Sequence, residues 1–106
     1  MKKKTNRNYK KGYAFERSIV ESYRKIGWVA FRSAGSHSPI DVVVINPKNV
    51  EVILIQCKNK VLTDGAVERE IEYVKSSGLH TQYMTAVRVL LAYKEKGHRG
   101  YKLKPV

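Results

Sequence analysis

The sequence predicts one α/β domain, in which a central β-sheet is flanked by helices. Two short apolar runs, residues 42–45 (VVVI) and 52–55 (VILI), are bounded by turn residues and are too short for helices, so they indicate the two buried strands of a hairpin. Apolar residues at helical spacing occur both before and after this pair. The length of 106 residues suits a single domain, and the chain shows neither an internal repeat nor a linker.

The charge balance points to a polyanionic partner. The chain has 21 Lys and Arg against 9 Asp and Glu, a formal net charge of +12, which is typical of proteins that bind nucleic acid or anionic lipid. No apolar stretch approaches the roughly 20 residues of a membrane span, and the N-terminus lacks the apolar core of a signal peptide. The single cysteine, Cys57, excludes an internal disulfide. We therefore expect a cytoplasmic, intracellular protein without a membrane partner or a structural zinc site.

The chain begins with a basic run that leads into an amphipathic helix. Residues 1–11 carry six basic residues and no acid, which predicts a flexible arm. This arm either contacts the DNA backbone or only aids solubility. One folded domain is expected over residues 12–106. Over residues 12–26 the apolar side chains recur on one helical face, and Gly27 is a natural stop. Glu16 lies at the flank of that face, from which its carboxylate can be directed along the sheet.

The order of the remaining elements completes the predicted fold. A loop of small residues, 33–39, leads into the hairpin, whereas residues 81–85 give no clear pattern. Four further elements are expected from their patterns: a strand over residues 28–32, a helix over 66–77, and strands over 87–93 and 101–106.

The hairpin brings polar side chains together at one end. If it turns about residues 48–49, residue i faces residue 97 − i, so Asp41 lies opposite Gln56. Side chains alternate along a strand, so Gln56 and Lys58 project on one face and Cys57 on the other. Polar residues at this position are either ordinary strand ends in solvent or parts of a functional site.

The functional alternative is a metal-dependent phosphodiesterase site. A carboxylate and an amide oxygen can hold Mg²⁺, which prefers oxygen ligands. Lys58 would then orient the attacking water or offset the charge of the phosphoryl group. In the preceding loop, Ser36 or His37 is placed to touch a phosphate, although the composition fits a plain connector equally well.

This combination of residues resembles the PD-(D/E)XK nucleases and, within that superfamily, the archaeal Holliday junction resolvases. The resemblance rests on Lys11-Gly12-Tyr13-Ala14-Phe15-Glu16-Arg17-Ser18-Ile19-Val20, Gly27-Trp28-Val29, Arg32, Ser36, Asp41 and Gln56-Cys57-Lys58. It covers residues 11–60 well and the remainder by the order of elements. It implies a restriction-endonuclease-like fold with a twisted mixed sheet flanked by helices. It also implies dependence on Mg²⁺, with Mn²⁺ as a substitute, and a homodimer that makes paired cuts in four-way DNA junctions.

The resemblance also implies residue roles. The catalytic residues would be Glu16, Ser36, Asp41, Gln56 and Lys58, with Lys58 as the catalytic lysine and Ser36 as the loop serine near the scissile phosphate. Glu16 and Asp41 would be the acidic metal-site residues, and we expect the side-chain oxygen of Gln56 and the backbone carbonyl of Cys57 to complete the metal ligands. Contacts with the DNA backbone are expected from Lys2, Lys3, Lys4, Arg7, Lys10, Lys11, Arg17, Arg32 and Lys60.

Two positions depart from the resolvase pattern. A proline precedes Asp41 by two residues instead of one, and Gln56 stands where the resolvases usually carry glutamate. Because the Gln-Xaa-Lys form is common in the Mrr-type restriction endonucleases, a restriction-type nuclease is one alternative, although those enzymes usually add a recognition domain that this length does not accommodate. A basic DNA-binding module with an inactive site is another, since backbone binding explains the charge equally well. The convergence of Glu16, Asp41 and Lys58 favours the resolvase.

Overall fold

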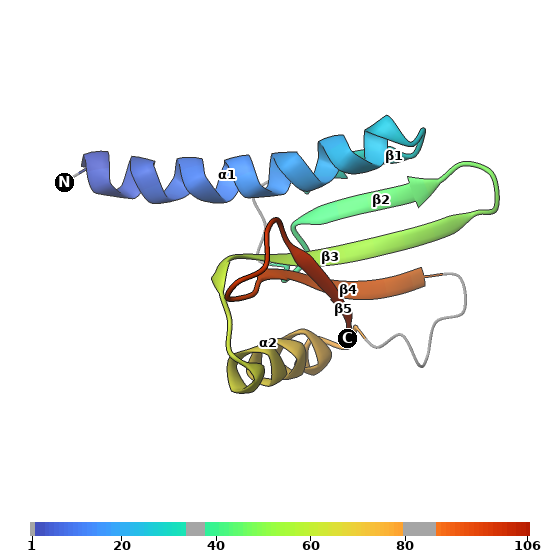
Figure 1. The fold of residues 1–106 in the computed structure, drawn as a ribbon. Helices are drawn as coiled ribbons and strands as arrows, with labels where there is room; N and C mark the ends of the chain where they lie inside the picture. Colours follow the sequence, from blue (N-terminus) through green and yellow to red (C-terminus); the bar gives the residue numbers. More distant parts are fainter. Residues whose placement is uncertain (1, 34–37, 80–86) are drawn as a thin grey trace.

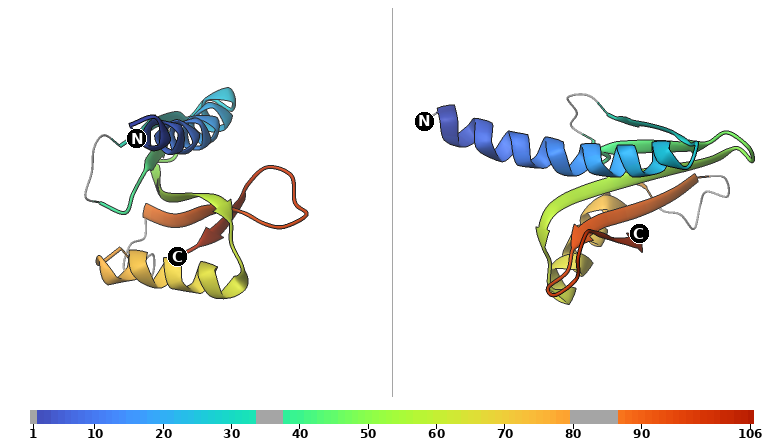
Figure 2. Two further views of the ribbon diagram at one scale, coloured as in Figure 1. Left: turned by 90° about the vertical axis from the view of Figure 1, so that its left-hand side faces the viewer. Right: turned by 45° about the horizontal axis from the view of Figure 1, so that its top comes forward.

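A computed structural model describes residues 2–33, 38–79 and 87–106 and shows a five-stranded sheet with one helix on each face (Figure 1). Figure 2 shows the three layers edge-on, with the sheet between the helices. The elements are α1 (Lys2–Lys25), β1 (Val29–Arg32), β2 (Val42–Asn46), β3 (Glu51–Val61), α2 (Asp64–Ser76), β4 (Val87–Lys94) and β5 (Lys102–Pro105). The predicted α/β domain is therefore confirmed. Among the described residues, neither α1 nor α2 has the apolar length that a membrane span needs.

The sheet is mixed, with strands in the order β1-β2-β3-β4-β5. Neighbouring strands are antiparallel except β3 and β4, which are parallel. A parallel pair needs a long crossover connection. Helix α2 lies within this connection, and it packs on the face of the sheet opposite α1 (Figure 2).

The predicted hairpin register is confirmed. Every pair between β2 and β3, from Val42 with Ile55 to Asn46 with Glu51, follows the expected relation. The turn over residues 47–50 is closed by the Asn46 side chain, whose Oδ1 accepts a hydrogen bond from the Lys48 N–H at 3.0 Å. An asparagine side chain mimics a backbone turn in this way.

Strand β3 is longer than its apolar run predicts. The sequence indicates a strand over residues 52–55, but the ladder continues through the polar residues to Val61. The reason is the parallel neighbour: Gln56 pairs with Leu91, and Cys57 pairs with Ala92 of β4. Polar residues 56–58 are thus held on a paired central strand instead of a fraying end.

The core has two halves that correspond to the two faces of the sheet. Along β3, Ile53, Ile55 and Cys57 pack with the α1 side of the core. Leu54 packs on the α2 side, and Lys58 pairs with a residue of α2. The predicted alternation of Cys57 and Lys58 between the faces is therefore correct.

The first helix begins earlier than its apolar pattern predicts. Residues 2–11 are helical and continue α1 towards the N-terminus, ahead of the start at residue 12 that the apolar pattern predicts. Lysine and arginine are good helix formers, and residues added to an existing helix do not bear the cost of nucleation. The predicted contact of this segment with DNA is a separate matter and stays a prediction.

The other boundaries differ by only a few residues. Helix α2 begins at Asp64 because Thr63 caps it: the Thr63 hydroxyl accepts a hydrogen bond from the Ala66 N–H at 3.3 Å. The ambiguous stretch 81–85 and the loop residues Ser36 and His37 lie outside the described residues.

Candidate active site

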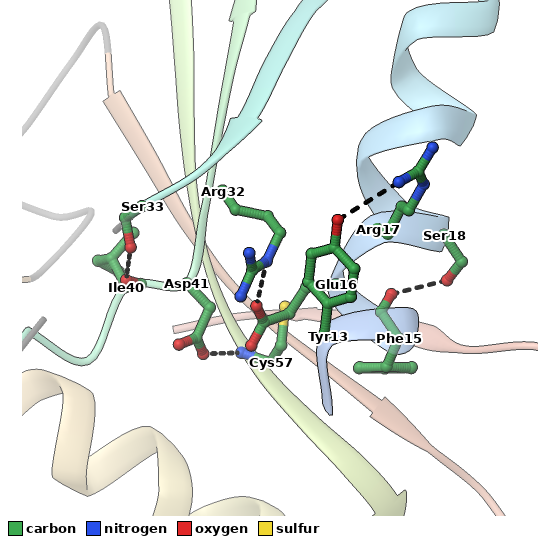
Figure 3. Close-up of polar contacts among 10 residues, drawn as sticks. All are labelled: Tyr13, Phe15, Glu16, Arg17, Ser18, Arg32, Ser33, Ile40, Asp41 and Cys57. Atoms are coloured by element: carbon green, nitrogen blue, oxygen red, sulfur yellow. Dashed lines mark hydrogen bonds and ion pairs between the residues drawn. The ribbon is translucent and has the colours of Figure 1, made fainter. Parts of the chain in front are cut away.

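A cleft of about 490 Å³ lies beside the start of β2 and the polar segment of β3. Its walls come from α1, α2 and the segment that leads into β2. Its lining residues are Glu16, Ser38, Pro39, Asp41, Gln56, Cys57, Lys58, Glu70 and Tyr73. The structure thus brings together the predicted catalytic and metal-binding residues apart from Ser36, which lies outside the described residues. Figure 3 shows the Asp41 carboxylate, from the segment just before β2, bonded to the Cys57 N–H, and Glu16 extending from α1 to its partner Arg32.

Asp41 is held by the hairpin backbone. Its N–H donates to the Ile55 carbonyl at 2.8 Å, which extends the β2–β3 pairing by one residue. Its Oδ2 accepts a hydrogen bond from the Cys57 N–H, also at 2.8 Å (Figure 3). This hydrogen bond anchors the carboxylate at one oxygen and directs the side chain along the cleft.

The electrostatic surroundings of Asp41 favour a nearby cation. Burial raises the pKa of the Asp41 carboxyl, and the Glu16 carboxylate adds to this increase. The Cys57 N–H, Lys58 and Arg32 act in the opposite direction but do not cancel it. A cation in the cleft would favour the ionised form that the protein alone disfavours.

The Cys57 thiol is not part of this chemistry. Burial raises the pKa of the thiol, and the carboxylates of Asp41 and Glu16 raise it further, so the sulfur is neutral at physiological pH. The side chain packs against the α1 side of the core. Cys57 therefore contributes to the site through its backbone.

Gln56 carries an unsatisfied oxygen at the cleft. The residue is only 5% exposed, and its Oε1 is buried without a hydrogen bond from any described residue. Such an atom costs roughly 1–3 kcal/mol unless a donor or a cation satisfies it. The described part of the chain contains no group of three His, Cys, Asp or Glu side chains placed to hold a metal ion. Amide and carbonyl oxygens would therefore have to complete a metal site here, and the donor set of Asp41, Gln56 and the Cys57 carbonyl fits a hard cation such as Mg²⁺.

Lys58 has a partner that its own stretch of sequence does not reveal. Its Nζ lies 3.7 Å from Oε2 of Glu70 on α2, and both side chains are partly exposed at the cleft. Glu70 precedes the buried Ile71 and lies at the flank of the apolar stripe of α2. That flanking position is the one feature of the sequence that could have pointed to Glu70. The residues around it do not show which strand α2 faces, so the contact with Lys58 could not be predicted.

Glu16 forms an ion pair with a residue that was expected to contact DNA. Arg32 Nε lies 2.8 Å from Glu16 Oε1, and the Arg32 guanidinium lies over the Tyr13 ring at 4.3 Å (Figure 3). These contacts join α1 to the end of β1. The pair fixes Glu16 at the wall of the cleft, and it gives Arg32 a structural contact besides any role with DNA.

The other predicted DNA-binding residues are spread over α1 and β3. Arg17 donates to the Tyr13 hydroxyl at 3.3 Å and lies 3.8 Å from Glu21. Lys11 and Lys60 are exposed, and Lys11 lines a second groove, on the other side of β3. The side chains of Lys2, Lys3, Lys4, Arg7 and Lys10 lie outside the described part of the structure.

The family model of the archaeal Holliday junction resolvases (Hjc) matches residues 7–99. This chain belongs to that family. The match spans the cleft residues and both helices, and it confirms the resemblance drawn from the sequence.

A solved structure has the same fold. The Hjc resolvase of Archaeoglobus fulgidus, an archaeal hyperthermophile, matches this resolvase-family chain with a TM-score of 0.54 and 23% sequence identity. The alignment covers 90% of this chain and 72% of the other. The restriction-endonuclease-like fold that the resemblance implied is therefore present. No curated protein sequence gives a significant match.

Proposed function

We propose that this resolvase-family chain is a Mg²⁺-dependent endonuclease that cuts four-way DNA junctions. The observation that carries the proposal is the cleft, in which Asp41, Gln56 and Lys58 of the hairpin meet Glu16 of α1. A DNA-binding module would not require two carboxylates and a lysine to converge beside an unsatisfied oxygen. The net charge of +12 supplies the attraction to the DNA backbone. We also propose an intracellular location, which a DNA substrate supports.

The metal would be held by Asp41, the Gln56 oxygen and the Cys57 carbonyl, with Glu16 close by. When bound, Mg²⁺ supplies an activated water and neutralises charge on the phosphoryl group. Mn²⁺ would substitute, because it accepts the same oxygen ligands.

The remaining polar groups of the cleft would position the reacting atoms and balance their charge. Lys58 offers its ammonium group as a hydrogen-bond donor to the attacking water or to a phosphate oxygen, and Glu70 keeps that ammonium at the cleft. The hairpin register fixes Asp41 and Lys58 relative to each other, so little reorganisation is needed when the substrate binds. No covalent bond between protein and DNA is required.

The test compares a synthetic four-way junction with a linear duplex of matched sequence, each incubated with Mg²⁺ or EDTA. We expect junction cleavage in Mg²⁺ only. Asp41→Asn and Lys58→Ala should abolish cleavage and retain junction binding, because neither residue dominates the backbone contacts. A variant that cuts at the wild-type rate would remove the proposed site.

The same assay separates the other candidate functions. Gln56 favours one of them, a restriction-type nuclease, because Mrr-type enzymes share the Gln-Xaa-Lys form. Equal cleavage of duplex and junction would support that candidate. Tight DNA binding without cleavage in any divalent cation would support a binding module with an inactive site.

We further propose that the active form is a homodimer that makes paired cuts. A four-way junction is close to two-fold symmetric, and two opposed cuts need two sites at a fixed spacing, which a C₂ dimer provides. Apolar side chains remain for an interface: Val29, Phe31 and Tyr73 are 50%, 44% and 53% exposed. Of the segment 79–84, which we also expect to contribute, only Leu79 is among the described residues. Light scattering at moderate salt should give twice the chain mass; a monomer that stays monomeric on a junction would refute the dimer.

A further inference from the structure

A second groove, of about 750 Å³, lies on the other side of β3 from the cleft. It is bounded by α1, the end of β3 and the β4–β5 loop. Successive residues connect the two sites: Lys58 lines the cleft, and Asn59 lines the groove. On α1, Glu16 faces the cleft, and its neighbour Phe15 lines the groove. In the left view of Figure 2, the segment leading into β2 and the β4–β5 loop lie on opposite sides of β3.

The charge of the groove is opposite to that of the cleft. Lys11, Lys94 and His98 line it, and none of its nine described lining residues is acidic. The cleft contains the carboxylates of Glu16 and Asp41 as well as that of Glu70. The cleft therefore suits a cation and its phosphate, whereas the groove suits an anion without a metal.

The walls of the groove are held by contacts among the described residues. Asn59 Nδ2 donates to the Lys11 carbonyl at 3.1 Å, which ties α1 to β3. Lys94 lies over the Phe15 ring at 5.6 Å, and the Tyr101 hydroxyl lies 2.9 Å from Ser22 Oγ. The Lys94 ammonium group is thus held at the wall, and Tyr101 offers a partly exposed ring beside it.

The groove also contains an unsatisfied acceptor. Asn59 Oδ1 is buried and receives no hydrogen bond from any described residue. Lysine ammonium groups at the same groove are donors that this oxygen can attract. A positively charged groove that follows the phosphate backbone is a recurring feature of nucleic-acid-binding proteins.

We propose that this groove binds the phosphate backbone of a second arm of branched DNA. The proposal rests on the function proposed above and adds to it a source of structure selectivity. The cleft and the groove open on opposite sides of β3, so a straight duplex with its phosphate in the cleft does not also pass through the groove. Two arms that leave a branch point reach both openings, and Lys94 and His98 contact only the second arm.

The experiment measures binding of a labelled four-way junction and of a matched linear duplex in EDTA, at several salt concentrations. The variants are Lys94→Gln and His98→Gln, with Lys96→Gln as the matched control because Lys96 is exposed in the same loop but does not line the groove. For each ion pair with a phosphate that a variant removes, junction affinity should fall about fivefold to tenfold and the slope of log K against log salt should flatten by about 0.9. Duplex affinity and the control should change less than twofold.

Lys94→Arg keeps the positive charge and should bind the junction as the wild type does. This variant shows whether the charge of residue 94, and not the lysine contact with Phe15, supports junction binding. Unchanged junction affinity in both Gln variants would overturn the proposal, and so would an equal decrease for duplex and junction. Cleavage of the junction by the wild-type protein in Mg²⁺ is measured in parallel. If the wild type cuts the junction and the groove variants lose their preference for junction over duplex, both proposals are supported. If the wild type binds the junction but does not cut it, the proposed nuclease activity is refuted, and the binding data still test the groove.

Discussion

Replacing Gln56 by glutamate should make the stability of this protein depend strongly on Mg²⁺. The side chain is 5% exposed and lines the cleft beside Asp41, and its Oε1 has no donor among the described residues. A carboxylate at this position is disfavoured without metal, because a like charge and burial both oppose ionisation. With metal it becomes a better ligand than the amide, because it adds a charge for a hard cation.

The two effects have opposite signs. Without metal, a buried acceptor left unpaired costs about 1–3 kcal/mol, and more when it is charged. For a domain of this size, each kcal/mol lowers the melting temperature by about 4–8 °C. If the carboxylate tightens Mg²⁺ binding tenfold, saturating metal adds about 1.4 kcal/mol more stabilisation than it adds to the wild type.

The assay is thermal unfolding in EDTA and over a Mg²⁺ titration, followed by circular dichroism. Gln56→Leu is the matched control: it has similar volume and removes the unsatisfied oxygen, so it should melt at or above the wild-type temperature in EDTA and respond less to Mg²⁺ than the wild type does. Cleavage by Gln56→Glu should reach half its maximum at a lower Mg²⁺ concentration than cleavage by the wild type.

Two results would refute this reasoning. If Gln56→Glu and the wild type gain the same number of degrees from Mg²⁺, Gln56 does not contact the metal. If Gln56→Leu responds to Mg²⁺ as strongly as the wild type does, the amide oxygen is not a ligand.

Four further predictions concern other parts of the molecule. The pKa of Asp41 is raised above its ordinary 3.8, so the protonated carboxyl stabilises the fold at low pH, and this stabilisation is lost as the pH rises through the folded-state pKa. Asp41→Asn should therefore raise the melting temperature in EDTA at pH 7, and this increase should vanish below about pH 3.8. Glu70→Gln should slow single-turnover cleavage about 10- to 100-fold with unchanged junction binding, and it should shift the pH–rate profile, because the carboxylate that holds Lys58 is removed; an unaltered profile would exclude this role. Deleting residues 2–10 should lower the affinity for duplex and junction alike and flatten the salt dependence by up to about 0.9 for each phosphate that the segment neutralises; an unchanged slope would mean that the segment does not touch DNA. Val50 is 77% exposed with a φ of +49°, so Val50→Asn should raise the free energy of unfolding by about 1 kcal/mol, measured by urea denaturation.

The hairpin could be predicted from sequence because its determinants are local. A turn at residues 47–50 between two β-branched runs fixes which residues face each other, and the register then places Asp41 opposite Gln56 without information from the rest of the chain. The same register and the alternation of side chains predicted that Lys58 and Cys57 lie on different faces.

The features that the sequence did not reveal depend on distant partners. The length of β3 is set by β4, and the contact between Glu70 and Lys58 depends on which way the crossover helix turns. The ion pair between Arg32 and Glu16 was not predicted, because composition cannot distinguish a cation that faces solvent from one that faces a carboxylate. The helical conformation of residues 2–11 could not be predicted from periodicity, because this segment has no apolar stripe.

The parallel pairing of β3 with β4 has a consequence for the order in which the site is assembled. The β2–β3 hairpin closes over a short turn, whereas Val52 meets Val87 only after the whole crossover has been made. Contacts between residues far apart in sequence form late, because their loop-closure entropy must be overcome first. During synthesis, Asp41, Gln56 and Lys58 can therefore come together before the wall that carries Glu70 has docked and before β4 supports Gln56. A nascent chain would therefore expose an open site with incomplete walls, and the cleft is complete only once the last strands have closed the domain.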